Sequence, residues 1–117
     1  MPRDDRATTA EKAELYDVTM PLLKAMDSEF KELSKRRPND AVSVAKIKVV
    51  NRLLEKCHGT LDDEASVEYL DLLDEDNVPL NSDVVLMLSQ FVAAMEQFHA
   101  NYWKGRLGWG ITNRRSK

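Results

Sequence analysis

Arg52 and His58 are the two residues of this sequence whose types and spacing best suit catalysis. A neutral imidazole can take a proton from an attacking hydroxyl group and return it to a leaving group, and a guanidinium can stabilise negative charge that develops on a phosphate. One helix could carry both side chains, because only five residues separate them. Phosphodiester cleavage is therefore one hypothesis for this chain.

The segment from Arg52 to His58 resembles the loose Arg-x4–6-His motif of HEPN-type ribonucleases, which are small helical bundles. The resemblance implies RNA cleavage where two copies of the motif face each other, with His58 as acid or base and Arg52 on the phosphate. Leu53 departs from the family pattern, in which a polar residue is common after the arginine. His58 also precedes Gly59, and the helix dipole stabilises a histidine at a helix C-terminus. We favour this helix-terminal role, and the sequence predicts a protein that is not an enzyme.

No metal or cofactor site is predicted from the sequence. Cys57 is the only cysteine, and with two histidines it cannot supply the four Cys or His ligands of a structural zinc site. The acidic stretch 71–83 lacks the glycine and the final glutamate of a calcium-binding loop. We expect Cys57 to act as a small apolar residue of the core.

The elements that must position these residues are predicted to be helices. Helical spacing of apolar residues and capping signals predict helices over residues 8–36, 40–58, 61–74 and 83–104. In the first of these the apolar stripe consists of Leu15, Val18, Leu22, Met26, Phe30 and Leu33. In the last, Phe91, Phe98 and Tyr102 form one stripe that is expected in the core. Pro21 predicts a kink or a break in the first helix, because proline removes a backbone donor and clashes with the preceding turn.

The ends of these helices are marked by capping residues. The expected N-caps are Thr8, Asp40, Thr60 and, for the last helix, Asn81 or Ser82. Gly59 and Gly105 are expected to follow the ends of the second and fourth helices. The predicted fold is all-α, a compact antiparallel bundle of about four helices in one domain over residues 8–105. Residues 1–7 are expected to be flexible, and residues 106–117 to form an irregular basic tail.

Charge is distributed unevenly along the 117 residues. The net charge of −3 argues against a uniformly basic nucleic-acid-binding protein. An acidic patch is predicted from Asp62, Asp63, Glu64, Glu68, Asp71, Asp74, Glu75 and Asp76. A basic stripe with a spacing of four residues is predicted from Lys48, Arg52 and Lys56. Such faces keep a small protein soluble, and they also suit complementary patches that steer a partner or a second copy of the chain.

Tryptophan and arginine are concentrated near the C-terminus. The predicted partner-binding residues are Trp103, Arg106, Trp109, Arg114 and Arg115. Both residue types dominate the binding energy of protein interfaces, and both also suit contact with nucleic-acid bases and phosphates. The alternative is that Trp109 folds back onto its own bundle.

The sequence thus favours a non-catalytic, helical protein–protein interaction module, such as an adaptor, subunit or inhibitor, which could self-associate through its acidic and basic surfaces. The alternative is an RNA- or DNA-binding helical protein, at the extreme a HEPN-like ribonuclease. The longest nearly apolar stretch, 84–95, is shorter than the roughly 20 residues that a membrane-spanning helix needs. The N-terminus lacks the apolar run of a signal peptide, and a cytoplasmic location is expected.

Overall fold

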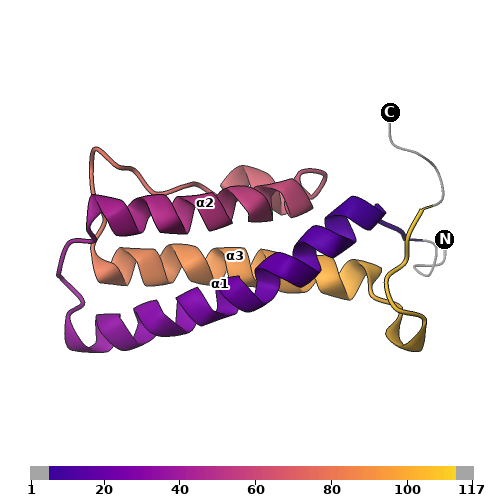
Figure 1. Ribbon diagram of the computed structural model, residues 1–117, viewed down its shortest axis with the longest axis horizontal. Coiled ribbons are helices and arrows are strands. Elements are labelled where there is room, and N and C mark those ends of the chain that lie inside the picture. The colour runs from indigo at the N-terminus through magenta and orange to yellow at the C-terminus, as the bar shows by residue number, and fades with distance from the viewer. Residues whose placement is uncertain (1–5, 113–117) are drawn as a thin grey trace.

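The computed structural model describes residues 6–112, and these residues form three α-helices. The helices are α1 (Ala10–Arg36), α2 (Val44–Leu61) and α3 (Asn81–Tyr102), with short 3-10 helices η2 (Ala65–Tyr69) and η3 (Gly105–Leu107). α1 runs opposite to α2 and α3, which run the same way because segment 62–80 returns along the bundle (Figure 1). The all-α prediction is confirmed, and the predicted bundle of four helices is wrong for the described residues.

α1 is a single helix that continues through Pro21. Its N-cap is Thr9, one residue after the predicted Thr8, and the Thr9 Oγ1 accepts a hydrogen bond from the backbone N–H of Lys12 at 3.2 Å. Pro21 lies on the exposed side of the helix. Water can therefore bind the carbonyl group that the missing N–H of Pro21 leaves unpaired.

The predicted third helix, 61–74, does not form. The chain instead makes the one short 3-10 helix η2 and then runs extended along α2, so that Leu70 and Leu73 are both buried. Two side chains of α2 fix this path by binding its backbone. His58 Nε2 lies 2.6 Å from the carbonyl oxygen of Leu70, while the Asn51 side chain bonds to both the N–H and the C=O of Leu73 at 2.8 and 2.9 Å.

The ends of α2 and α3 differ from prediction by two to four residues, because other residues cap them. Ser43 rather than Asp40 caps α2, through its Oγ and the N–H of Lys46. Thr60 is a buried residue of α2 rather than a cap. Leu80 is the N-cap of α3, and its N–H donates to Asp83 Oδ2 at 2.9 Å.

Gly59 lies inside α2, not beyond its end. A Cβ atom at this position would lie 3.1 Å from the Leu15 side chain of α1. Gly59 therefore allows α1 and α2 to approach closely at this level.

The core lies where the three helices meet, and α1 packs against both of the others. Its largest fully buried side chains include Leu23 of α1, Ile47 and Leu54 of α2, and Phe91 and Phe98 of α3. Burial of Phe91 and Phe98 confirms two of the three core residues predicted for the last helix, while the third, Tyr102, is half-buried. The molecule is elongated, 47 × 28 × 23 Å.

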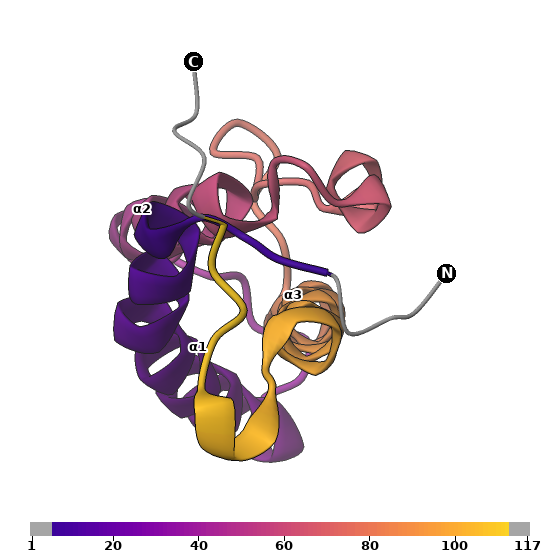
Figure 2. The ribbon, with the colours of Figure 1, turned by 90° about the vertical axis from the view of Figure 1, so that its right-hand side faces the viewer.

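The segment that follows α3 turns back across the end of the bundle (Figure 2). Trp103 and Trp109 form an antiparallel bridge, and Thr8 and Ile111 form a parallel one. Gly105 and Gly108 permit the turn, since both have a positive φ, 62° and 74°. This segment therefore joins the end of α3 to the residues that lead into α1.

Candidate protein interaction surface

Arg52 and His58 point to different parts of the molecule. Arg52 is exposed and lines a hollow between α1 and α2. His58 is half-buried on another side of α2, where its ring stacks on Phe91 with centroids 5.4 Å apart and its Nε2 contacts the carbonyl oxygen of Leu70. The structure thus gives His58 a role in fixing the segment after α2, and it does not bring the His58 and Arg52 side chains together.

Cys57 is fully buried between the helices. Burial raises the pKa of the Cys57 thiol from 9.0 to about 11, although a hydrogen bond with Thr19 acts in the opposite direction. A thiol with such a pKa is protonated at neutral pH and is a poor nucleophile.

Trp109 packs against its own bundle. Its ring lies 5.1 to 5.7 Å, centroid to centroid, from a group of four rings, namely Tyr16, Phe98, His99 and Trp103. Its Nε1 donates to the carboxylate of Asp17 at 3.2 Å. Of the other predicted partner-binding residues, Trp103 and Arg106 are exposed, while Arg114 and Arg115 lie outside the described residues.

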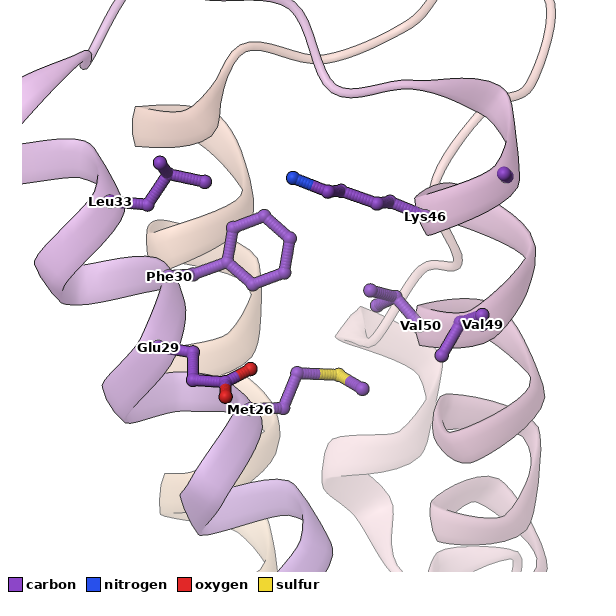
Figure 3. Close-up of a pocket in the computed structure, with 8 residues that line it drawn as sticks. Met26, Glu29, Phe30, Leu33, Lys46, Val49 and Val50 are labelled. Atoms are coloured by element: carbon purple, nitrogen blue, oxygen red, sulfur yellow. The ribbon is translucent and has the colours of Figure 1, made fainter.

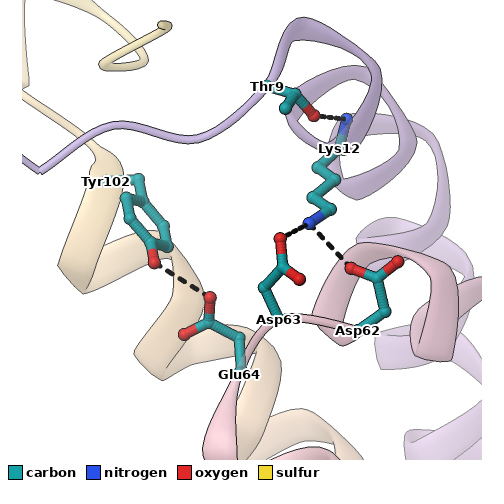
Figure 4. Close-up of polar contacts among 6 residues, drawn as sticks. All are labelled: Thr9, Lys12, Asp62, Asp63, Glu64 and Tyr102. Atoms are coloured by element: carbon teal, nitrogen blue, oxygen red, sulfur yellow. Dashed lines mark hydrogen bonds and ion pairs between the residues drawn. The ribbon is translucent and has the colours of Figure 1, made fainter. Parts of the chain in front are cut away.

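Several residues of the predicted acidic patch form ion pairs or hydrogen bonds with other residues of the same chain (Figure 4). Lys12 of α1 forms ion pairs with Asp62, at 2.7 Å, and with Asp63. Glu64 accepts a hydrogen bond from the Tyr102 hydroxyl at 2.9 Å, and Asp74 Oδ1 accepts from the backbone N–H of Asp76. Glu64 is half-buried, and the other residues of the predicted acidic patch are exposed, including Asp62, Asp63 and Asp74.

The predicted basic stripe borders an apolar surface that the sequence did not predict. Lys48, Arg52 and Lys56 are all exposed on α2, and Arg52 and Lys56 line the hollow between α1 and α2. We call this surface the α1–α2 face. Its apolar residues are Leu15, Val18, Leu22, Ala25, Met26, Phe30, Leu33, Ala45, Val49, Val50 and Leu53.

Three large side chains of the α1–α2 face are more than half exposed. Val18 is 60% exposed, Leu22 56% and Val49 52%. The sequence analysis placed Val18 and Leu22 in the apolar stripe of the first helix, and the structure shows that these two members of the stripe are exposed. The core side of α1 is formed by Met20 and Leu23, which lie outside the predicted stripe, together with Phe30, which belongs to it.

Two adjoining hollows of about 310 and 460 Å³ run along the α1–α2 face. Met26, Glu29 and Val49 line both of them, and none of their lining residues comes from α3. In the first hollow, side chains of the two helices point toward one another, with Met26 and Phe30 on one side and Val49 and Val50 on the other (Figure 3). The hollows make the face a continuous open groove.

Opposite charges lie on the two helices that form the α1–α2 face. On α1, Glu29 lines both hollows, and the exposed stripe of Val18, Leu22 and Ala25 continues at helical spacing to Glu14 and Glu11 toward the start of the helix. On α2, the side toward the face carries Lys46, Arg52 and Lys56, with Lys48 beside them. Lys46, Arg52 and Lys56 form no ion pair with another residue of 6–112. Their charges are therefore available to a partner.

Comparison with protein-family models, with curated proteins and with solved structures finds no match to this chain. Among residues 6–112, no helix is long and apolar enough to cross a membrane. Within the same range, no group of three or more histidine, cysteine, aspartate or glutamate side chains is placed to hold a metal ion.

Proposed function

We propose that the protein is a non-catalytic protein–protein interaction module and that the α1–α2 face is its binding surface. The observation that carries this proposal is the exposure of Val18, Leu22 and Val49 in one groove. A contiguous exposed apolar surface rimmed by charged residues is typical of protein interaction sites. Its position beside Arg52 and Lys56 favours a protein partner over a nucleic acid, because an apolar centre adds nothing to phosphate binding.

The chemistry of the α1–α2 face specifies the partner that it would bind. The groove follows two antiparallel helices, and a surface of two further helices would complete a four-helix arrangement over it. Such a partner needs apolar side chains at its centre. It also needs acidic residues facing Lys46, Arg52 and Lys56 of α2, and basic residues facing the glutamates of α1.

Site-specific photocrosslinking tests whether the α1–α2 face contacts a protein. We expect a photoreactive phenylalanine at Leu22 or at Val49 to give a protein adduct in cells. The same residue at Leu86 of α3 should give none, since Leu86 is equally apolar and 62% exposed but lies away from the face. Adducts of equal yield from Leu22 and Leu86, or adducts from Leu86 alone, would overturn the proposal.

A further inference from the structure

We infer that the partner on the α1–α2 face is a second copy of this chain, in a twofold symmetric dimer that places α1 of each copy over α2 of the other. This inference rests on the proposed function and names its partner. The required partner has an apolar centre, acidic residues on one helix and basic residues on the antiparallel neighbour. The α1–α2 face has that pattern itself, since α1 carries Glu11, Glu14 and Glu29 along its exposed stripe and α2 carries Lys46, Arg52 and Lys56.

The charge pattern selects one of two symmetric arrangements. A twofold axis across the helices would place α1 over α1 and α2 over α2, so that glutamates face glutamates and lysines face lysines. Like charges opposed across an interface are strongly unfavourable. An axis parallel to the helices places α1 over the second copy's α2, where opposite charges meet. An interface of this kind uses the same patch on both copies and closes without further growth.

An axis parallel to the helices also determines which residues of the two copies lie at the same height along the bundle. Each residue of α1 then lies level with the α2 residues that it faces within its own copy. Glu29 and Lys46 line the same hollow, so Glu29 of one copy lies level with Lys46 of the other. Val18 and Leu22 share the second hollow with Leu53 and lie level with Leu53 of the second copy. Apolar side chains therefore meet at the centre, and opposite charges meet near the ends.

The size of the α1–α2 face is compatible with a small dimer interface. α2 has 18 residues and is about 27 Å long, and two packed helices span about 20 Å. The projected area is therefore about 500 Å². Two such faces together give about 1,000 Å², which is the lower limit for a specific interface.

Paired charge reversals test the dimer and its arrangement. One variant carries Glu14→Lys and Glu29→Lys, which places two new lysines on α1 where it would face the basic residues of the other copy's α2. The other carries Lys46→Glu and Lys56→Glu, which places two new glutamates on α2 where it would face the glutamates of the other copy's α1. In sedimentation equilibrium at about 50 µM, where a micromolar dimer is assembled, the native chain should have twice its 13.4 kDa mass. Each variant alone should dimerise at least about 100-fold more weakly, and an equimolar mixture should restore the dimer.

A native chain of 13.4 kDa would overturn the inference. So would variants that dimerise as well as the native chain, or a mixture that stays monomeric although both variants keep the native helical circular dichroism. Failure of the proposed function is recognised separately. If the native chain is monomeric and Leu22 crosslinks to a different protein, the proposed interaction surface stands and only the dimer is contradicted. If no adduct is specific to Leu22 and Val49, the interaction surface itself is contradicted.

Discussion

Replacement of Trp109 by alanine is expected to lower the free energy of unfolding by about 3 kcal/mol, which is the low end of the range for removal of a packed aromatic side chain. Trp109 contacts Tyr16 of α1 and Phe98 and His99 of α3, so the substitution removes packing between two helices as well as within the turn. It also removes the hydrogen bond from Nε1 to Asp17. In chemical denaturation the midpoint should fall, and the melting temperature should fall by about 10 °C.

Leu107→Ala is the matched control for Trp109→Ala. Leu107 lies in the same turn but is 86% exposed, so its truncation should change stability by less than about 0.5 kcal/mol. Trp109→Phe keeps much of the ring packing but loses the hydrogen bond to Asp17. Its stability should therefore lie between those of Trp109→Ala and Leu107→Ala. A Trp109→Ala protein as stable as Leu107→Ala would show that the C-terminal turn does not pack on the bundle in solution.

The stability of the protein is expected to fall by about 2–3 kcal/mol between pH 9 and pH 11 because of Cys57 alone. Burial raises the pKa of Cys57 from 9.0 to about 11 in the folded chain. Above pH 9 the unfolded chain therefore loses the thiol proton while the folded chain retains it, and unfolding becomes more favourable as the pH rises. The stabilisation is fully present below pH 9 and is lost as the pH passes through the folded pKa.

Three other groups with raised pKa values also lower the stability of the protein as the pH rises. The contribution of Cys57 must therefore be measured with a variant that lacks its thiol. Burial, and then the charges of Glu96 and Asp17, raise the pKa of Tyr16. Burial and the hydrogen bond to Glu64 raise the pKa of Tyr102. Burial lowers the pKa of Lys12, but its contacts with Asp62 and Asp63 outweigh burial and the net pKa is raised.

Cys57→Ala retains these three groups and removes only the thiol. Urea unfolding of both proteins at several values between pH 8 and pH 11 should give curves of stability against pH that converge as the pH rises. The variant is less stable at pH 8 because of the lost side-chain volume, and it loses less stability on alkalinisation. Parallel curves would show that the Cys57 pKa is the same in the folded and unfolded chains.

The three α-helices could be predicted from the sequence because each has long apolar stripes at helical spacing. The segment after α2 could not, because its conformation is set by contacts between distant residues. Its acidic start and its leucines also fit an amphipathic helix. The side chains of Asn51 and His58 bind the backbone of Leu73 and Leu70, however, and hold the chain extended. Neither contact has a local sequence signal.

The α1–α2 face was missed for a different reason. α1 carries two apolar stripes, and spacing alone does not say which of them faces the core. Val18 and Leu22 have the types and intervals of core residues, yet α3 packs on the side of Leu23 and leaves them exposed. The basic residues beside the face, Lys48, Arg52 and Lys56, could be identified from their spacing, but their apolar neighbours could not.

The mass of two matched leucine variants in solution tests the α1–α2 face most directly. Leu22 and Leu86 are both helical and similarly exposed, at 56% and 62%, but only Leu22 lies in the groove. We expect Leu22→Glu to sediment as a monomer of 13.4 kDa, because it places a charge at the apolar centre of the interface, and Leu86→Glu to remain a dimer like the native chain. A folded Leu22→Glu variant that remains a dimer, as Leu86→Glu should, would contradict the assignment of the α1–α2 face as the surface through which the two copies bind.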